Sequence, residues 1–98
     1  FNEIYLLVEK LGLDWNSIIK GVTGDRRIGH SHYQVPGHDG DKGFGGTCFP
    51  KDINALISTF EKNGVDPKVL KSVWSRNLDV RSDLDWARSS SAVDDNDC

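Results

Sequence analysis

Apolar side chains recur at helical spacing along most of the chain. The first repeat occupies positions 1, 4, 5, 7, 8 and 11, and Gly12 ends it. Asp14 is then placed to cap a second helix over residues 15–22, whose apolar residues share one face. Because the first pattern is at full strength from the first residue, with no capping residue before it, we expect the chain to be cut from a longer helix.

The second half of the chain predicts two more helices. In the first of them, residues 51–60 carry an apolar face, and the helix ends near residues 63–64. Asp66 followed by Pro67 is a strong start signal, and the stripe after it predicts one helix from Pro67 to about Trp86. Polar positions break this last stripe.

The pattern therefore predicts an all-α fold of about four helices, with a long glycine-rich loop that carries the candidate active site. No Gly-x-Gly-x-x-Gly segment follows a strand and no β-α-β alternation is visible, so the chain cannot build a dinucleotide-binding domain. We expect a core drawn from both halves of the chain, with the members Leu7, Ile18, Leu56, Phe60, Val69, Val73 and Trp74.

The composition limits the kinds of partner. With 98 residues the chain forms one domain at most, and its formal net charge of −3 gives no broad basic surface for nucleic acid or an anionic membrane. No apolar run approaches the roughly 20 residues that span a bilayer, and no signal-peptide pattern occurs. We therefore expect no nucleic-acid or membrane partner, and a cytoplasmic location.

The stretch GFGGTCFPKD, residues 43–52, has the layout of a chemical site. Three glycines in four positions leave backbone amides open to a ligand, and Cys48 follows them. Since the next residues look helical, Cys48 would lie at or just before a helix N-terminus, where aligned peptide dipoles favour thiolate over thiol. Lys51 adds a positive charge, and Asp52 can accept a proton or hold a water. The alternative is a connecting loop with an inert cysteine.

A long segment with little periodicity, residues 23–42, precedes this stretch. Loops of such length in a small domain are usually functional or disordered. Within it, Arg26 and Arg27 could pair bidentately with a phosphate or carboxylate, and the alternative is a solvated arginine pair.

The histidines and cysteines predict neither a metal centre nor a disulfide framework. His30, His32 and His38 fall in the loop, and there is no Cys-x-x-Cys or helical His-x-x-x-His pair. We expect solvated histidines and no metal, with a zinc site as the weaker alternative. Cys98 is the last residue of a polar tail, so a bridge from it to Cys48 would be an accident of proximity.

Two motifs resemble one known enzyme family. The stretch GFGGTCFPKD is similar to the catalytic-cysteine motif of the UDP-glucose/GDP-mannose dehydrogenase family, whose UDP-glucose members read much like GFGGxCxPKD. The segment DRRIG at residues 25–29 resembles the family's DxRIG, and FNE at residues 1–3 with the following helix extends the resemblance to about Trp86. The resemblance implies the central, helical domain of such an enzyme at residues 1–86. Residues 87–98 are rich in serine and aspartate and almost without apolar residues, so we expect a flexible polar tail there.

The resemblance also implies a reaction and roles for individual residues. The family oxidises the primary alcohol carbon of a nucleotide-sugar twice and passes two hydrides to two NAD molecules. Cys48 would be the nucleophile that forms a thioester with the sugar, and Asp52 would position or activate the water that hydrolyses it. The implied substrate-binding residues are Arg27, which would reach into the neighbouring subunit's site, and Tyr33, Gly43, Phe44, Gly45, Gly46 and Lys51.

Parts of the family's machinery are missing from this sequence. The NAD-binding domain is absent, as are a lysine and an asparagine that the family carries upstream, so we expect the isolated chain to bind NAD poorly and to be inactive. The motif favours UDP-glucose, which would yield UDP-glucuronate for polysaccharide, over GDP-mannose or UDP-N-acetylmannosamine. A homodimer is expected, because the family's central domain forms much of a dimer interface. The alternative is a helical dimerisation module without chemistry, which would not need Cys48 as a reactive thiolate.

Overall fold

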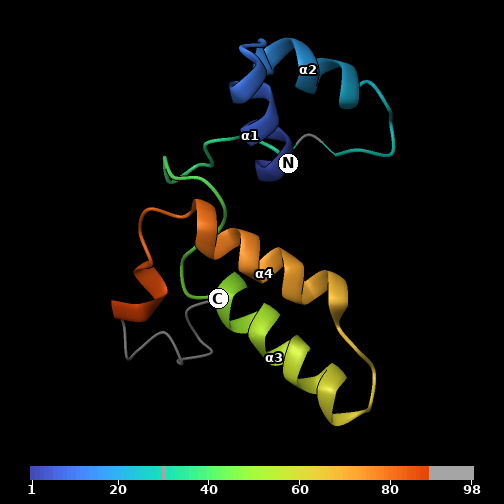
Figure 1. The fold of residues 1–98 in the computed structure, drawn as a ribbon, viewed down its shortest axis with the longest axis vertical. Coiled ribbons are helices and arrows are strands. Elements are labelled where there is room, and N and C mark those ends of the chain that lie inside the picture. The colour runs from blue at the N-terminus through green and yellow to red at the C-terminus, as the bar shows by residue number, and fades with distance from the viewer. Residues whose placement is uncertain (30, 89–98) are drawn as a thin grey trace.

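Helices are the regular elements of the computed structural model, which describes residues 1–29 and 31–88. They are α1 (Asn2–Leu11), α2 (Trp15–Val22), α3 (Phe49–Lys62), α4 (Lys68–Val80) and the short 3-10 helix η1 (Asp85–Arg88). The described residues contain no strand, so the predicted all-α fold of about four helices is confirmed. Figure 1 shows two pairs of helices, α1 with α2 and α3 with α4.

The first helix pair has the bounds that its local signals predict. Gly12 follows α1 with a φ of 67°, the left-handed conformation that glycine adopts without strain, and its amide donates to the Glu9 carbonyl. Asp14 caps α2 in an extended conformation. The two helices pack through the rings of Tyr5 and Trp15, whose centroids lie 5.3 Å apart.

α3 and α4 form an antiparallel pair in the second half of the chain (Figure 1). α3 ends two residues before Gly64, whose φ of 72° reverses the chain, as the sequence predicts. α4 begins at Lys68, one residue later than predicted, because Pro67 takes the cap position. An ion pair crosses between the two helices, with Lys71 Nζ 3.3 Å from Glu61 Oε2.

The prediction that the last helix runs to about Trp86 is wrong, because α4 ends at Val80. In a continued helix the amides of Ser82 and Asp83 would donate to carbonyls one turn earlier. Both donate instead to the Asp41 carboxylate, at 3.0 and 2.8 Å. A side chain from the preceding loop therefore competes with the helix and ends it.

The long connection between α2 and α3 passes between the two helix pairs (Figure 1). Val35, near its middle, is buried. Val8 in α1, Ile19 in α2 and Ile57 in α3 are buried as well. The apolar core is therefore small and draws on both pairs and on the loop between them.

Four of the predicted core residues are wrong, because Leu7, Leu56, Val69 and Val73 are exposed. In α1 and α3 the residue directly after each predicted leucine is buried instead. The apolar side chains of these helices cover more than one face, so the helical repeat alone does not fix which face points inward.

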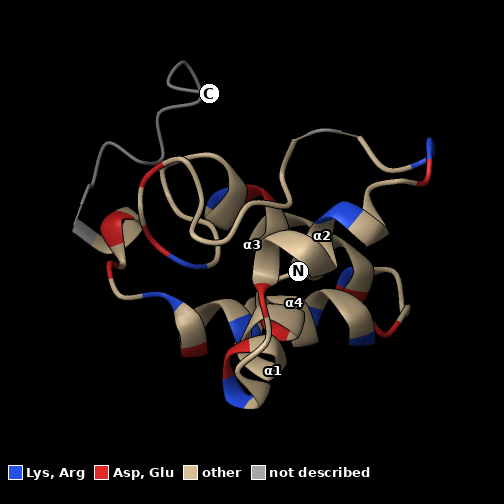
Figure 2. Cartoon of the chain, turned by 90° about the horizontal axis from the view of Figure 1, so that it is seen from above, with Lys and Arg blue, Asp and Glu red and all other residues tan. Residues whose placement is uncertain are grey.

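Basic and acidic residues are interspersed over the described chain (Figure 2). None of the helices in these residues is long and apolar enough to cross a membrane. Ala87 and Arg88, the first residues of the predicted tail, belong to η1. His30 and the rest of that tail, residues 89–98, lie outside the described residues.

Candidate functional site

Cys48 is the N-terminal cap residue of α3, in the position that the sequence predicts. Its carbonyl accepts the first helical hydrogen bond, from the amide of Asp52 at 2.8 Å. Lys51 Nζ lies 3.7 Å from Asp52 Oδ1, so a cation and a carboxylate meet within one turn of the half-buried cysteine. The amides and the dipole of a helix N-terminus favour negative charge at such a position.

The sulfur of Cys48 is disulfide-bonded in this structure. The sequence holds one other cysteine, Cys98, which lies outside the described residues. The sequence predicts no disulfide, so the bonded state of the Cys48 sulfur corrects that expectation. Because the thiolate is the nucleophilic form of cysteine, any chemistry at Cys48 requires reduction first.

A buried asparagine holds the start of the glycine-rich loop. Asn77 of α4 is 2% exposed, accepts a hydrogen bond from the Phe44 amide at 2.7 Å and donates one to the Phe44 carbonyl at 2.9 Å. The preceding amide, that of Gly43, donates to Asn2 Oδ1 at 2.7 Å. Side chains from α1 and α4 therefore bind the backbone on this side of the loop.

The end of the glycine run is held from η1. The Gly46 amide donates to both carboxylate oxygens of Asp85, at 2.9 and 3.0 Å. Close packing also explains two glycines, because a Cβ at Gly43 would collide with the Asn77 side chain and one at Gly45 with the Arg81 guanidinium. The loop therefore lies directly on side chains of α4 and η1.

Arg81 lies at the centre of a cluster of three carboxylates. Its side chain is 1% exposed, and Nη2 lies 2.7 Å from Asp39 Oδ2 and 3.4 Å from Asp85 Oδ1. Nε lies 3.4 Å from Asp41 Oδ2 and donates to the Asp83 carbonyl at 2.7 Å. The segment before the glycine run and the segment after α4 thus meet on one guanidinium.

The same cluster shifts the pKa values of Asp39, Asp41 and Arg81. The hydrogen bond from Arg81 holds the pKa of Asp39 below its ordinary value, against the opposing effect of burial. Burial raises the pKa of Asp41, but three backbone N–H donors and the Arg81 charge outweigh it, so the net shift is downward. Burial lowers the pKa of Arg81 itself, and the carboxylates more than compensate.

Aromatic contacts connect the loop to both helices of the second pair. The Phe44 ring lies 6.2 Å from that of Phe49 and 6.1 Å from that of Trp74. Trp74 in turn packs on Trp86 of η1 at 5.3 Å. Since Phe49 follows Cys48 directly, these rings link the neighbour of the cysteine to the anchored part of the loop.

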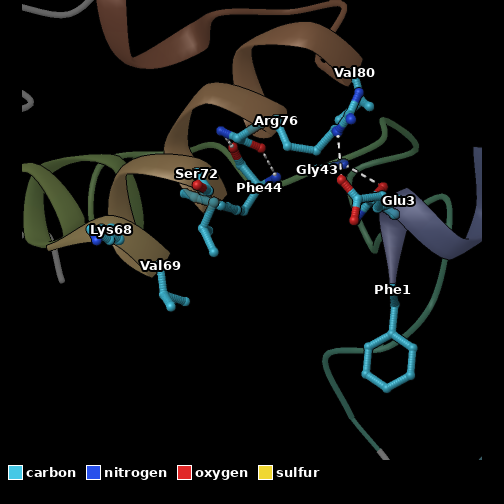
Figure 3. Close-up of a pocket in the computed structure, with 12 residues that line it drawn as sticks. Phe1, Glu3, Gly43, Phe44, Lys68, Val69, Ser72, Arg76 and Val80 are labelled. Atoms are coloured by element: carbon cyan, nitrogen blue, oxygen red, sulfur yellow. Dashed lines mark hydrogen bonds and ion pairs between the residues drawn. The ribbon is translucent and has the colours of Figure 1, made fainter.

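A cleft of about 530 Å³ lies on one side of the loop, between the start of α1 and α4. Figure 3 shows Gly43 and Phe44 between side chains of these two helices. At its edge, Arg76 Nε lies 3.0 Å from Glu3 Oε1. Cys48 and the other residues of the first turn of α3 do not line this cleft.

Two of the predicted substrate-binding residues lie in the long loop after α2 and do not line the cleft. The Arg27 side chain is 89% exposed, and its Nη2 lies 2.6 Å from Asp25 Oδ2. The Tyr33 ring packs on that of Phe1, with centroids 6.1 Å apart. The structure thus places Lys51 and Asp52 beside the cysteine, whereas Arg27 and Tyr33 make their contacts elsewhere.

The residues that hold the loop were missed by the sequence analysis. Asn77 and Arg81 are two of the polar residues that interrupt the apolar stripe of α4, four positions apart. Polar residues at core spacing indicate a buried hydrogen-bonding role, because buried polar groups are almost always paired. In the part of the chain described here, no group of three or more His, Cys, Asp or Glu side chains could hold a metal ion.

A comparison with known protein families supports the resemblance found in the sequence. Residues 1–79 match the family model of the UDP-glucose/GDP-mannose dehydrogenase family, central domain. The chain therefore belongs to this family.

Several bacterial UDP-glucose 6-dehydrogenases are similar to the chain. Over 76 residues it is 42% identical to that of Rickettsia bellii and 40% identical to that of Pseudomonas aeruginosa, covering 78% of this chain and 16% of each relative. Over 72 residues it is 42% identical to UDP-glucose 6-dehydrogenase YwqF of Bacillus subtilis, covering 74% of this chain and 15% of the relative. The chain thus spans about a sixth of the length of these relatives. No solved structure matches it.

Proposed function

We propose that this chain is the cysteine-bearing central domain of a UDP-glucose 6-dehydrogenase, which converts UDP-glucose to UDP-glucuronate. The observation that carries the proposal is the position of Cys48, which lies in a chain of this family and caps the N-terminus of α3. The similar proteins are UDP-glucose 6-dehydrogenases, which supports UDP-glucose over GDP-mannose or UDP-N-acetylmannosamine.

In the proposed reaction, the reduced Cys48 thiolate attacks the aldehyde carbon of the once-oxidised sugar. The dipole of α3 and the charge of Lys51 stabilise the thiolate before the attack. After the second oxidation, Asp52 positions the water that hydrolyses the thioester and releases the carboxylate. We assign the substrate contacts to Arg27, Tyr33, Gly43, Phe44, Gly45, Gly46 and Lys51.

The two hydrides of this reaction need an acceptor, which in the proposal is NAD. A dinucleotide-binding unit is built from strands that alternate with helices, and the described residues contain no strand. The residues present do not fit NAD, so none of them is given a role in binding it. We therefore expect this chain alone not to oxidise UDP-glucose.

We also infer that the chain forms a homodimer. Large apolar side chains are exposed on several elements, among them Phe1, Leu7, Leu11, Val69 and Val73. Exposed apolar surface on a small domain is typical of an interaction site. The same surface supports a second candidate function, a dimerisation module without chemistry, and the reactivity of Cys48 distinguishes the two.

The deciding experiment is the pH dependence of Cys48 alkylation by iodoacetamide, measured after reduction in a Cys98→Ser variant. The enzymatic function predicts a thiol pKa clearly below the roughly 8.5 of a free cysteine, with slower alkylation when UDP-glucose is present. The matched control is Cys48→Ser, in which Cys98 is the only thiol, and GDP-mannose serves as the control ligand. An ordinary pKa without protection by UDP-glucose would instead favour the dimerisation module.

A further inference from the structure

We propose that Asn77 and Arg81 are positioning residues, which fix the backbone of the glycine-rich loop and thereby the place of Cys48 at the start of α3. The catalytic meaning of this inference rests on the proposed function, because it takes Cys48 as the nucleophile. The hydrogen bonds that carry it do not depend on that function.

Asn77 fixes Phe44, four residues before Cys48. Its planar amide offers a donor and an acceptor together, so it can bond the amide and the carbonyl of one residue, as a neighbouring strand would. A carboxylate at this position would keep the acceptor for the Phe44 amide but would set its second oxygen against the Phe44 carbonyl. The role therefore requires an amide side chain rather than any polar group.

Arg81 fixes Gly46, two residues before Cys48, and it acts through Asp85. Both carboxylate oxygens of Asp85 accept from the Gly46 amide, while Oδ1 also lies 3.4 Å from Arg81 Nη2. The ion pair with Asp39 at 2.7 Å also holds the guanidinium. Because a guanidinium presents its donors in a rigid fork, carboxylates bound to it take defined positions.

The two anchors act on the same short segment from one helix face. Asn77 and Arg81 are four residues apart on α4 and at its end, so their side chains lie on the same side of the helix. The loop residues that they hold, Phe44 and Gly46, flank Gly45, where even a methyl group would collide with the Arg81 guanidinium. Since α4 also packs against α3, α4 orients both the glycine-rich loop and α3, which meet at Cys48.

The test is amide hydrogen exchange by NMR, measured on the reduced 98-residue chain carrying Cys98→Ser. Asn77→Ala should speed exchange of the Phe44 amide by about tenfold relative to the Trp74 amide in α4, which reports opening of the whole chain. Asp85→Ala should speed exchange at Gly46 and leave Phe44 unchanged. This site-by-site difference is not produced by a general loss of stability.

Matched controls come from the same chain. Asn63→Ala removes an asparagine whose Nδ2 donates to the Thr59 carbonyl within its own helix, and it should leave the Phe44 and Gly46 amides unchanged. Arg81→Lys keeps the charge and loses the fork, so exchange of the Gly46 amide should rise. This variant allows the test even if Arg81→Gln prevents folding. Unchanged Phe44 exchange in folded Asn77→Ala would overturn the proposal, as would equal acceleration at Phe44, Gly46 and Trp74.

Alkylation of Cys48 in the same variants separates this inference from the proposed function. If the anchors position the nucleophile, the pH midpoint of Cys48 alkylation should move toward that of a free thiol in Asn77→Ala and Asp85→Ala. Faster exchange of the loop amides in the variants, together with an ordinary thiol pKa in the parent chain, would support the anchoring and contradict the proposed function. Protection of Cys48 by UDP-glucose with unchanged loop amides would support the function and overturn the anchoring.

Discussion

The side chain of Asn77 pairs with both backbone groups of Phe44, a residue 33 positions earlier in the chain. This contact joins α4 to the loop in front of Cys48. Because a chain of this size buries little apolar surface, such polar contacts carry a larger share of its tertiary structure than they would in a larger domain. The packing of the second helix pair against the loop therefore depends on hydrogen bonds and ion pairs.

Arg81→Gln should lower the free energy of unfolding by roughly 2–3 kcal/mol. Removing one partner of a buried ion pair costs about 3–5 kcal/mol, and the loss is smaller here because the three carboxylates keep some access to water. Urea denaturation followed by circular dichroism measures the change. A single domain of this size has only about 5–15 kcal/mol in total, so the variant should stay largely folded without denaturant but unfold at a lower urea concentration than the parent.

The matched control for that substitution lies five residues earlier on the same helix. The Arg76 side chain is 43% exposed, and its ion pairs with Glu3 and Asp79 are at the surface. Arg76→Gln should therefore cost less than about 1 kcal/mol. An equal loss of unfolding free energy in the two variants would mean that burial of the Arg81 cluster does not contribute to stability.

Gly45→Ala should destabilise the chain by about 1–3 kcal/mol, because its methyl group would overlap the Arg81 guanidinium and the Asp85 carboxylate. Gly21→Ala is the control, since outside the neighbouring residues and backbone of α2 no atom lies within 4 Å of the added Cβ. That change should stabilise the chain by about 0.5–1 kcal/mol through helix propensity. Thermal denaturation compares the two, and a neutral Gly45→Ala would show that the loop can move away from α4.

The Arg81 cluster should make stability depend on pH. Asp39 and Asp41 have pKa values below the ordinary 3.8 in the folded chain, so the unfolded chain binds protons more readily than the folded one. Their contribution is fully present above the unfolded pKa and is lost as the pH falls through the folded pKa. The melting temperature should therefore fall steeply below about pH 4.

Asp39→Asn isolates this effect from that of other carboxyl groups. Hydrogen bonds from Arg27 also lower the pKa of Asp25, so some loss of stability in acid is expected in any variant that retains this pair. The Asp39→Asn variant should melt at a lower temperature near neutral pH and lose less stability on acidification than the parent. Parallel pH profiles for the two chains would contradict the assignment.

Local signals allowed most of the helices to be predicted from sequence. Gly12 and Gly64 end α1 and α3, and Asp14 precedes α2, because each effect involves only residues within a turn of the boundary. The position of Cys48 at the start of α3 was predictable for the same reason. The buried apolar face of each helix was not predictable, since the helices carry more apolar residues than the small interior can hold.

The contacts that hold the loop could not be predicted, because their partners are far apart in sequence. Asp41 ends α4 by binding amides 41 and 42 residues later, and no pattern within the helix indicates it. The polar residues Asn77 and Arg81 could be recognised as unusual on an apolar stripe. Their partners could not, since only the path of the loop brings Phe44 and Asp39 to them.

The expected homodimer leads to a prediction about the exposed face of α4. Val69 is 76% exposed and lines the cleft beside α1, so Val69→Asp should change the free energy of unfolding by less than about 0.5 kcal/mol. If this face forms the dimer contact, a buried charge there should weaken association by at least about tenfold.

The control is Val65→Asp in the α3–α4 turn, where the side chain is 52% exposed and does not line the cleft. Size-exclusion chromatography with light scattering should give a dimeric parent, a dimeric Val65→Asp variant and a monomeric Val69→Asp variant. A monomeric parent at high concentration would contradict the homodimer, and a dimeric Val69→Asp variant would exclude this face as its contact.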